Sequence, residues 1–134
     1  MNTLFKSFGD GRMTFENGIL FVDYNQGLII DEKVLIRQIM CRQQLTGDAD
    51  FFMMVNMTNA KDITEGALTL AATNPSPEHV KAIATLTRYG VDHTRSKLYS
   101  VFDRPNIKTK AFLKAEEAMA WFEALDQLNL RKAG

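Results

Sequence analysis

The chain has 134 residues, of which 46% are hydrophobic and 24% are charged. Sixteen Lys and Arg balance sixteen Asp and Glu, so the formal net charge is zero. This composition excludes a disordered chain and predicts a single domain over residues 1–134, with residues 1–10 as an N-terminal arm on its surface. Whole-chain charge gives no reason to expect specific nucleic-acid binding, so any charged site must be local.

The cysteine count and the lengths of the apolar runs favour a location in the reducing cytoplasm. The single cysteine, Cys41, cannot form an intramolecular disulfide, and with two histidines it cannot complete the usual four-ligand zinc site. No apolar run reaches the ~18 residues of a membrane span. The first twenty residues also lack the basic and apolar regions of a signal peptide. We therefore expect a cytoplasmic protein that is not transmembrane.

The first element predicted is a β-hairpin. Residues 12–16 and 19–24 flank Asn17-Gly18, a dipeptide suited to the two positive φ angles of a type I′ turn. Apolar residues occupy both faces of the second strand, with Leu20, Val22 and Tyr24 on one face and Ile19 and Phe21 on the other. We expect this strand to lie in a sheet that is covered on both sides.

Helices and strands alternate after the hairpin. Residues 30–46 predict an amphipathic helix, since acidic residues open it, Gly47 follows it and apolar residues recur at helical spacing. Those apolar residues are Leu35, Ile36, Ile39 and Met40. Residues 51–57 are almost wholly apolar, which is typical of a buried parallel strand.

Residues 62–72 predict a short helix with a capping box, in which Asp62 accepts from the helix start and Glu65 reaches back. Residues 80–87 favour a covered strand, and a helix over residues 77–89 stays open as the alternative.

The last elements predicted are a helix over residues 92–102, an edge strand over residues 107–113 with outward lysines, and a helix over residues 115–128. The apolar stripe of the last helix contains Ala118, Met119, Phe122, Leu125 and Leu128. Strands that alternate with helices imply an α/β fold with a mostly parallel sheet, an N-terminal β-hairpin and about four helices.

This order of elements, which begins with the hairpin Phe15-Glu16-Asn17-Gly18-Ile19-Leu20, resembles the STAS domains of sulfate-transporter tails and anti-sigma-factor antagonists. It looks more closely like the SpoIIAA-like bacterial proteins of unassigned function, which share a Pro, a basic strand leading to a Phe, an acidic pair and an Ala-x-x-Trp helix. The matching segments here are Pro105 to Phe112 and Glu116 to Trp121. The resemblance implies a STAS-like fold over residues 12–125.

The antagonists carry a phosphorylatable Ser in an Asp-Ser-Ser-Gly segment, and the matching stretch here is Ile63-Thr64-Glu65-Gly66. Without that serine, and with the permanent charge of Glu65, a constitutive interaction surface is more natural than a phosphorylation switch. The resemblance implies a partner surface at the carboxyl end of the third strand and the following helix. The residues that we expect to bind a protein partner are Asn56, Thr58, Thr64 and Glu65.

Catalytic and metal-binding patterns are missing from the sequence. His79 and His93 are not spaced as metal ligands, Cys41 is expected to be a buried thiol, and no phosphate loop or nucleophile elbow occurs. We therefore expect no catalytic residue, no metal site and no cofactor.

Positive charge gathers between residues 88 and 114. One interpretation is an anion-binding patch, and the alternative is a set of solvated lysines that protect a sheet edge. The candidate patch residues are Arg88, Arg95, Lys97, Lys108 and Lys110.

These observations favour a non-enzymatic bacterial regulatory module that binds another protein. A small-molecule carrier or sensor for a lipid or nucleotide is the alternative, because an interior rich in Met and Phe could open a pocket beside the basic patch. The methionines are otherwise expected to fill the core. Leu4, Phe5 and Phe8 in the arm also predict a homodimer, formed through the arm or through residues 92–102.

Overall fold

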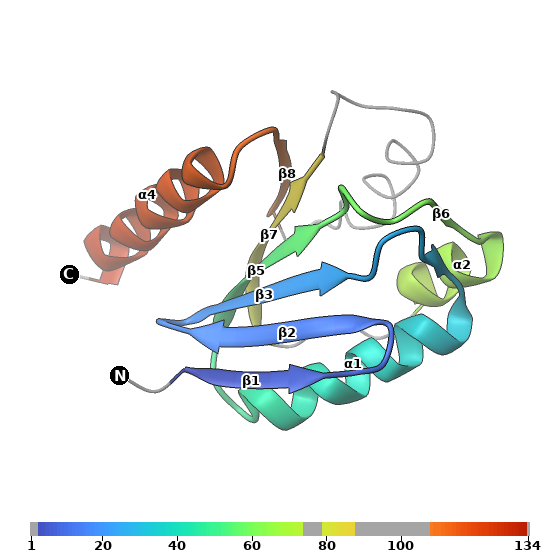
Figure 1. Ribbon diagram of the computed structural model, residues 1–134. Coiled ribbons are helices and arrows are strands. Elements are labelled where there is room, and N and C mark those ends of the chain that lie inside the picture. Colours follow the sequence, from blue (N-terminus) through green and yellow to red (C-terminus); the bar gives the residue numbers. More distant parts are fainter. Residues whose placement is uncertain (1–2, 74–78, 88–107, 134) are drawn as a thin grey trace.

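A computed structural model of the chain describes residues 3–73, 79–87 and 108–133. The described chain begins with consecutive strands, and helices then lie between the later strands, as Figure 1 shows. The strands are β1 (Leu4–Ser7), β2 (Gly11–Glu16), β3 (Ile19–Tyr24), β4 (Ile29–Ile30), β5 (Phe51–Asn56), β6 (Asp62–Ile63), β7 (Val80–Leu86) and β8 (Lys108–Phe112). The helices are α1 (Glu32–Thr46), α2 (Glu65–Thr73) and α4 (Ala115–Ala133).

Six strands form the main sheet in the order β1-β2-β3-β5-β7-β8. The pairs β1–β2 and β2–β3 are antiparallel, and the three pairs from β3 to β8 are parallel. Asn17 and Gly18 link β2 to β3 with φ angles of 53° and 76°, the left-handed values that the hairpin turn requires. The predicted α/β fold with a mostly parallel sheet and an initial hairpin is confirmed.

The N-terminal arm is part of this sheet. Residues 4–7 form the antiparallel edge strand β1, which pairs with β2, instead of lying as an irregular arm on the surface. Phe8 then enters the core at 8% exposure and packs edge-on against Tyr24. A four-residue strand is too short to show a strong period of two, so the sequence pattern gave this segment no strand signal.

The two faces of the sheet carry separate apolar clusters, which confirms that β3 is covered on both sides. The α1 face, on the side of α1 and α2, contains Met13, Leu20, Val22, Met53, Val55 and Ile83. The α4 face, on the opposite side, contains Ile19, Phe52, Met54, Ala82, Ala84 and Phe112 beneath Ala118 and Phe122. Figure 1 shows α4 on one side of the sheet and α1 and α2 on the other.

Helix α1 has nearly the predicted bounds, with a different buried face. The carboxylate of Asp31 caps it by accepting from the Val34 amide at 2.9 Å. Ile36 and Met40 were expected to be buried, yet they are 48% and 56% exposed. The helix instead buries polar side chains, Gln38 and Arg42, beside Val34, Leu35 and Cys41. The prediction failed because it assumed that an apolar side chain marks the buried face.

The start of α2 also differs from the prediction. Asp62 is not its N-cap, because Asp62 and Ile63 form β6, which pairs in parallel with β4. Thr64 caps the helix, and its hydroxyl accepts from the Ala67 amide at 3.1 Å. A two-residue strand leaves no periodic signal, so the capping pattern was placed two residues early.

The bounds of the remaining described elements agree closely with those predicted from the sequence. Residues 80–86 form strand β7, which excludes the alternative helix over residues 77–89, and β8 is the second edge of the sheet. In α4, Ala118 and Phe122 are buried, whereas Met119 and Leu128 are 39% and 48% exposed. Among the methionines, Met13, Met53, Met54 and Met57 fill the core, and Met40 does not. The predicted helix over residues 92–102 lies outside the described residues.

Candidate functional site

Helix α4 covers only part of its face of the sheet. Its buried side chains pack over β5, β7 and β8, where Phe122 stacks on Phe52 with ring centroids 4.7 Å apart. Further along the same face, β2 and β3 carry polar side chains at Arg12 and Asp23, which the hairpin register places directly opposite each other. No other described helix packs over this region, which is the candidate site.

A hydrogen-bonded network fixes the polar groups at the carboxyl ends of β3 and β5. The Asn56 amide donates to the Asp23 carboxylate at 3.0 Å. The carbonyl oxygen of Asn56 accepts from the Thr58 backbone amide at 3.0 Å and from its hydroxyl at 2.7 Å. Asn56 is therefore held from both ends of its carboxamide, and it orients the Asp23 carboxylate.

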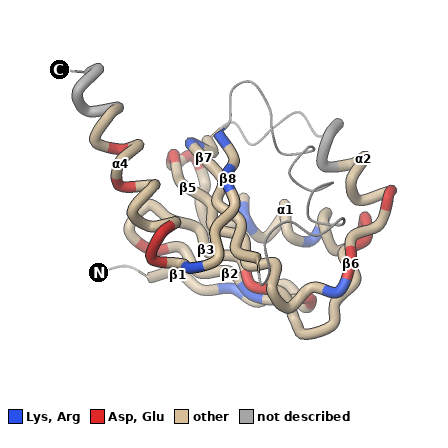
Figure 2. The backbone as a smooth tube through the Cα atoms, turned by 90° about the horizontal axis from the view of Figure 1, so that it is seen from above, with Lys and Arg blue, Asp and Glu red and all other residues tan. Residues whose placement is uncertain are grey.

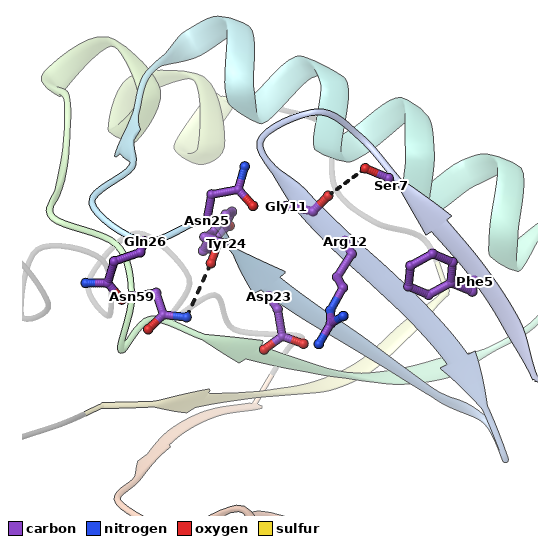
Figure 3. Close-up of a pocket in the computed structure, with 9 residues that line it drawn as sticks. All are labelled: Phe5, Ser7, Gly11, Arg12, Asp23, Tyr24, Asn25, Gln26 and Asn59. Atoms are coloured by element: carbon purple, nitrogen blue, oxygen red, sulfur yellow. Dashed lines mark hydrogen bonds between the residues drawn. The ribbon is translucent and has the colours of Figure 1, made fainter.

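A pocket of about 400 Å³ opens beside this network. Its lining residues are Phe5, Ser7, Gly11, Arg12, Asp23, Tyr24, Asn25, Gln26 and Asn59. Figure 3 shows Phe5, Arg12 and Asp23 projecting from the same side of the sheet, with Asn59 in the loop beyond β5. We refer to the surface formed by Phe5, Arg12, Asp23, Asn56 and Asn59 as the Arg12 cleft.

Arg12 is the most available charged group of the cleft. Its side chain is exposed, and within the described parts of the chain it makes no hydrogen bond or ion pair. The guanidinium therefore has donors to offer to a carboxylate or phosphate. Phe5, at 61% exposure, adds an aromatic surface next to it.

Gly11 allows β2 and β3 to meet closely at this pocket. A Cβ at this position would overlap the carbonyl oxygen of Asp23 and lie 2.9 Å from the Cα of Tyr24. Both contacts are with backbone atoms, so no side-chain rotation relieves them. The position requires glycine for close approach of the strands.

The structure divides the four predicted partner-binding residues between two places. Asn56 and Thr58 belong to the network of the Arg12 cleft. Thr64 and Glu65 begin α2, where the Thr64 hydroxyl is engaged as the helix cap. The grouping followed from the family resemblance, and the β4–β6 pair lies between the loop after β5 and the start of α2.

Two of the five candidate anion-binding residues lie in the described chain. Lys108 and Lys110 are exposed on the edge strand β8, and Figure 2 shows their positive charge along this strand. The Lys110 ammonium lies 5.5 Å from the centroid of the Phe112 ring, so part of its environment is aromatic. The other candidates, Arg88, Arg95 and Lys97, lie outside the described residues.

Cys41 and His79 lie away from the cleft. Burial raises the pKa of the Cys41 thiol, as expected of a structural cysteine. His79 pairs with the Asp50 carboxylate at 3.0 Å at the opposite ends of β5 and β7, and His93 is outside the described residues. Within the described ranges, no three His, Cys, Asp or Glu side chains gather as a metal site.

Sequence reasoning missed Arg12, Asp23, Phe5 and Asn59. The sequence did contain a signal for the first two. A two-residue turn at Asn17-Gly18 fixes the register of the hairpin, and this register places Arg12 opposite Asp23. Phe5 required knowledge that the arm is a strand. Nothing in the sequence pattern indicated that the loop after β5 turns Asn59 toward β3.

A family model matches residues 13–126, and its description is a domain of unknown function. The chain belongs to the DUF7793 family. The matched region of this DUF7793 member includes Asp23 and all of the Asn56 network, but neither Arg12 nor Phe5. No curated protein matches the sequence.

The fold of this DUF7793 chain is similar to a crystal structure from Shewanella loihica PV-4, an uncharacterised protein of the DUF3478 family with a SpoIIAA-like fold. The TM-score is 0.54 and the identity is 10%, over 90% of this chain and 91% of the other. This likeness confirms the predicted SpoIIAA-like fold and carries no function with it. In the described part of the chain, no helix has the length and apolar character of a membrane span.

Proposed function

We propose that the chain is a non-enzymatic bacterial STAS-like regulatory module, located in the cytoplasm, that binds another protein through the Arg12 cleft. The observation that carries the proposal is an exposed Arg12, without an ion pair to any described residue, beside a preorganised Asp23–Asn56–Thr58 network. Aromatic and Arg side chains are enriched where protein partners bind. The cleft offers one of each, on a rigid sheet.

The chemistry of the cleft favours an acidic segment of the partner. The guanidinium of Arg12 can donate two parallel hydrogen bonds to a carboxylate, and Phe5 can pack against an apolar neighbour of that carboxylate. Asp23 and Asn59 provide acceptors and donors for the partner's backbone. The network that holds Asn56 lowers the entropy lost on binding, since its side chain is already ordered.

Binding fits these side chains better than catalysis does. Among the residues that line the pocket, none is a His, Cys or Lys, and the Ser7 hydroxyl donates to the backbone carbonyl of Gly11 at 3.3 Å. A nucleophile would need a base within hydrogen-bond reach. We therefore propose no reaction at this surface.

The second candidate function is a sensor for a small molecule. Its support is the volume of the pocket, about 400 Å³, together with the exposed guanidinium of Arg12 in its lining. The polar lining fits a nucleotide better than an acyl lipid, because the buried methionines do not open into this pocket. Native mass spectrometry of freshly purified protein tests it, and a bound nucleotide mass lost in Arg12→Gln would support it.

A comparative pull-down from the native host tests the protein-binding function. The bait variants are Arg12→Gln and, as a matched control, Lys33→Gln, which removes one exposed charge from α1 on the opposite face of the sheet. We expect partners that bind the unmodified chain and Lys33→Gln to be lost from Arg12→Gln. Partner sets that are identical for all three baits would exclude the cleft as the binding surface.

A further inference from the structure

The two edge strands of the main sheet differ in how readily they could pair with a further strand. The outer strand β8 carries Lys108 and Lys110, and lysines on an edge oppose pairing with a further strand. The outer strand β1 is exposed at all four residues and carries the apolar side chains of Leu4 and Phe5. No other described strand pairs with its outer side.

The hydrogen bonds of β1 show which of its backbone groups face outward. The Phe8 amide donates to the Gly11 carbonyl at 3.1 Å, so Phe8 points its backbone groups toward β2. In an antiparallel ladder this direction alternates from one residue to the next, which turns Lys6 and Leu4 toward β2 as well. The N–H and C=O groups of Thr3, Phe5 and Ser7 therefore point away from the sheet.

These outward groups are self-complementary about Phe5. If β1 of a second copy approaches antiparallel, Phe5 can pair with Phe5 of that copy, and Thr3 can pair with its Ser7 on either side. The aromatic rings would then meet as a cross-strand pair, which stabilises a sheet. A register centred on Lys6 would instead place two ammonium groups opposite each other.

Helix α1 lies at the same edge of the sheet, on the face opposite Phe5. Arg37 on α1 pairs with Asp10 in the β1–β2 turn at 2.6 Å, and Lys6 of β1 lies close enough to Cys41 to affect its pKa. Met40 is three residues from Arg37 and thus lies on the same side of the helix, with 56% of its surface exposed. Figure 1 shows α1 running beside β1.

We propose that two copies of the chain associate through antiparallel β1 strands, with Phe5 paired across the two-fold axis on the α4 face and α1 of each copy on the opposite face of the joined sheet. The two sheets join into one continuous sheet, which places both Arg12 clefts on the same face. Phe5 then contributes to the dimer contact and to the wall of its own cleft. A two-fold contact of this kind closes on itself and leaves no free β1 edge.

The mass in solution is the first test. Multi-angle light scattering across a micromolar dilution series should give twice the 15.2 kDa of one chain at the higher concentrations. Phe5→Lys places like charges opposite each other and should return the mass to that of one chain. The matched control is Leu113→Lys, because Leu113 is 60% exposed next to β8 and Phe5 is 61% exposed on β1. Circular dichroism checks that both variants are folded.

Disulfide trapping tests the register. In a Cys41→Ala background, Phe5→Cys should form a disulfide-linked dimer on mild oxidation, because residues that share a hydrogen-bonded pair have Cα atoms ~5.5 Å apart. Ser7→Cys should not, because its own counterpart lies four residues away along the paired strand. A single-chain mass at every concentration would overturn the proposal. So would a dimer that Phe5→Lys leaves intact, or trapping by Ser7→Cys instead of Phe5→Cys.

Discussion

The hydroxyl of Tyr24 on β3 donates a hydrogen bond of 2.5 Å to the side-chain carbonyl of Gln38 on α1, inside the α1 face. Arg42 lies one helical turn further along α1 at 9% exposure. Burial lowers the pKa of its guanidinium, and the neighbouring Tyr24 acts in the opposite direction. The contact between α1 and the sheet therefore has a polar centre surrounded by apolar side chains.

Replacing Tyr24 by Phe should destabilise the protein by about 1–2 kcal/mol, because the buried carbonyl of Gln38 loses its donor. The free energy of unfolding in urea measures the effect. In the double variant with Gln38→Leu, no buried acceptor is left unpaired, so part of the stability should return. A single variant as stable as the unmodified chain would show that the Gln38 carbonyl finds another partner.

Stability should decline in alkaline solution as Cys41 and then Tyr24 begin to ionise in the unfolded chain. Burial raises the folded-state pKa of Cys41 above its ordinary 9.0 and that of Tyr24 above its ordinary 10.0. Above those ordinary values the unfolded chain releases protons that the folded chain retains, so the free energy of unfolding falls as pH rises. Below pH 8 these two groups should cause no such change.

Urea titrations at pH 7.5, 9.5 and 10.5, conditions chosen around those ordinary values, measure this decline. Cys41→Ala should flatten the first part of the curve, and Tyr24→Phe should flatten the part above pH 10, the ordinary pKa of tyrosine. If the free energy of unfolding of the double variant falls with pH as steeply as that of the unmodified chain, other groups cause the alkaline sensitivity.

Local chemistry made the sheet predictable from sequence. Asn17 and Gly18 require a turn with positive φ, which fixes both the hairpin and its register. The apolar run of β5 indicates a strand buried on both faces, and it is buried at every residue from Phe51 to Val55. The buried face of α1 was predicted wrongly for a physical reason. Gln38 is buried because its side-chain carbonyl accepts a hydrogen bond from Tyr24, which lies 14 residues earlier in the chain.

The candidate site was less predictable because it depends on which part of the sheet α4 leaves uncovered. Asn56 and Thr58 were expected at the site because the resemblance implies a partner surface at the carboxyl end of this strand, where parallel sheets form binding sites. Thr64 was grouped with them because the resemblance includes the start of the following helix in the same surface, and the two-residue pair β4–β6 that lies between them has no sequence signature. Arg12 follows from the hairpin register, while the exposure of its surroundings depends on how far α4 extends over the sheet.

Thr85→Val should stabilise the protein by about 1 kcal/mol. Thr85 is 0% exposed on β7, and its hydroxyl makes no hydrogen bond in the described structure. Valine has nearly the same shape, favours strands and removes the cost of burying an unpaired hydroxyl. The melting temperature measures the gain. A lower melting temperature would show that the hydroxyl has a hydrogen-bond partner in solution.

Two glycine substitutions should have very different effects, although each adds one methyl group. In Gly11→Ala the new Cβ overlaps the backbone of Asp23 and Tyr24, so the hairpin must shift. The expected loss is about 1–3 kcal/mol, the usual cost of overpacking. The shift would also move Arg12 relative to Asp23, so this variant should lose any ligand of the Arg12 cleft.

Gly66→Ala is the matched control for that loss. Its Cβ would overlap the carboxylate end of Glu32, which is a flexible side chain that can rotate away. Alanine in place of glycine within a helix raises stability by up to ~1 kcal/mol. This gain offsets the cost of moving the Glu32 side chain. Thermal unfolding of both variants should therefore show a large fall for Gly11→Ala and a small change for Gly66→Ala. Equal falls would mean that the close approach of β2 to β3 at Gly11 does not limit the size of the residue there.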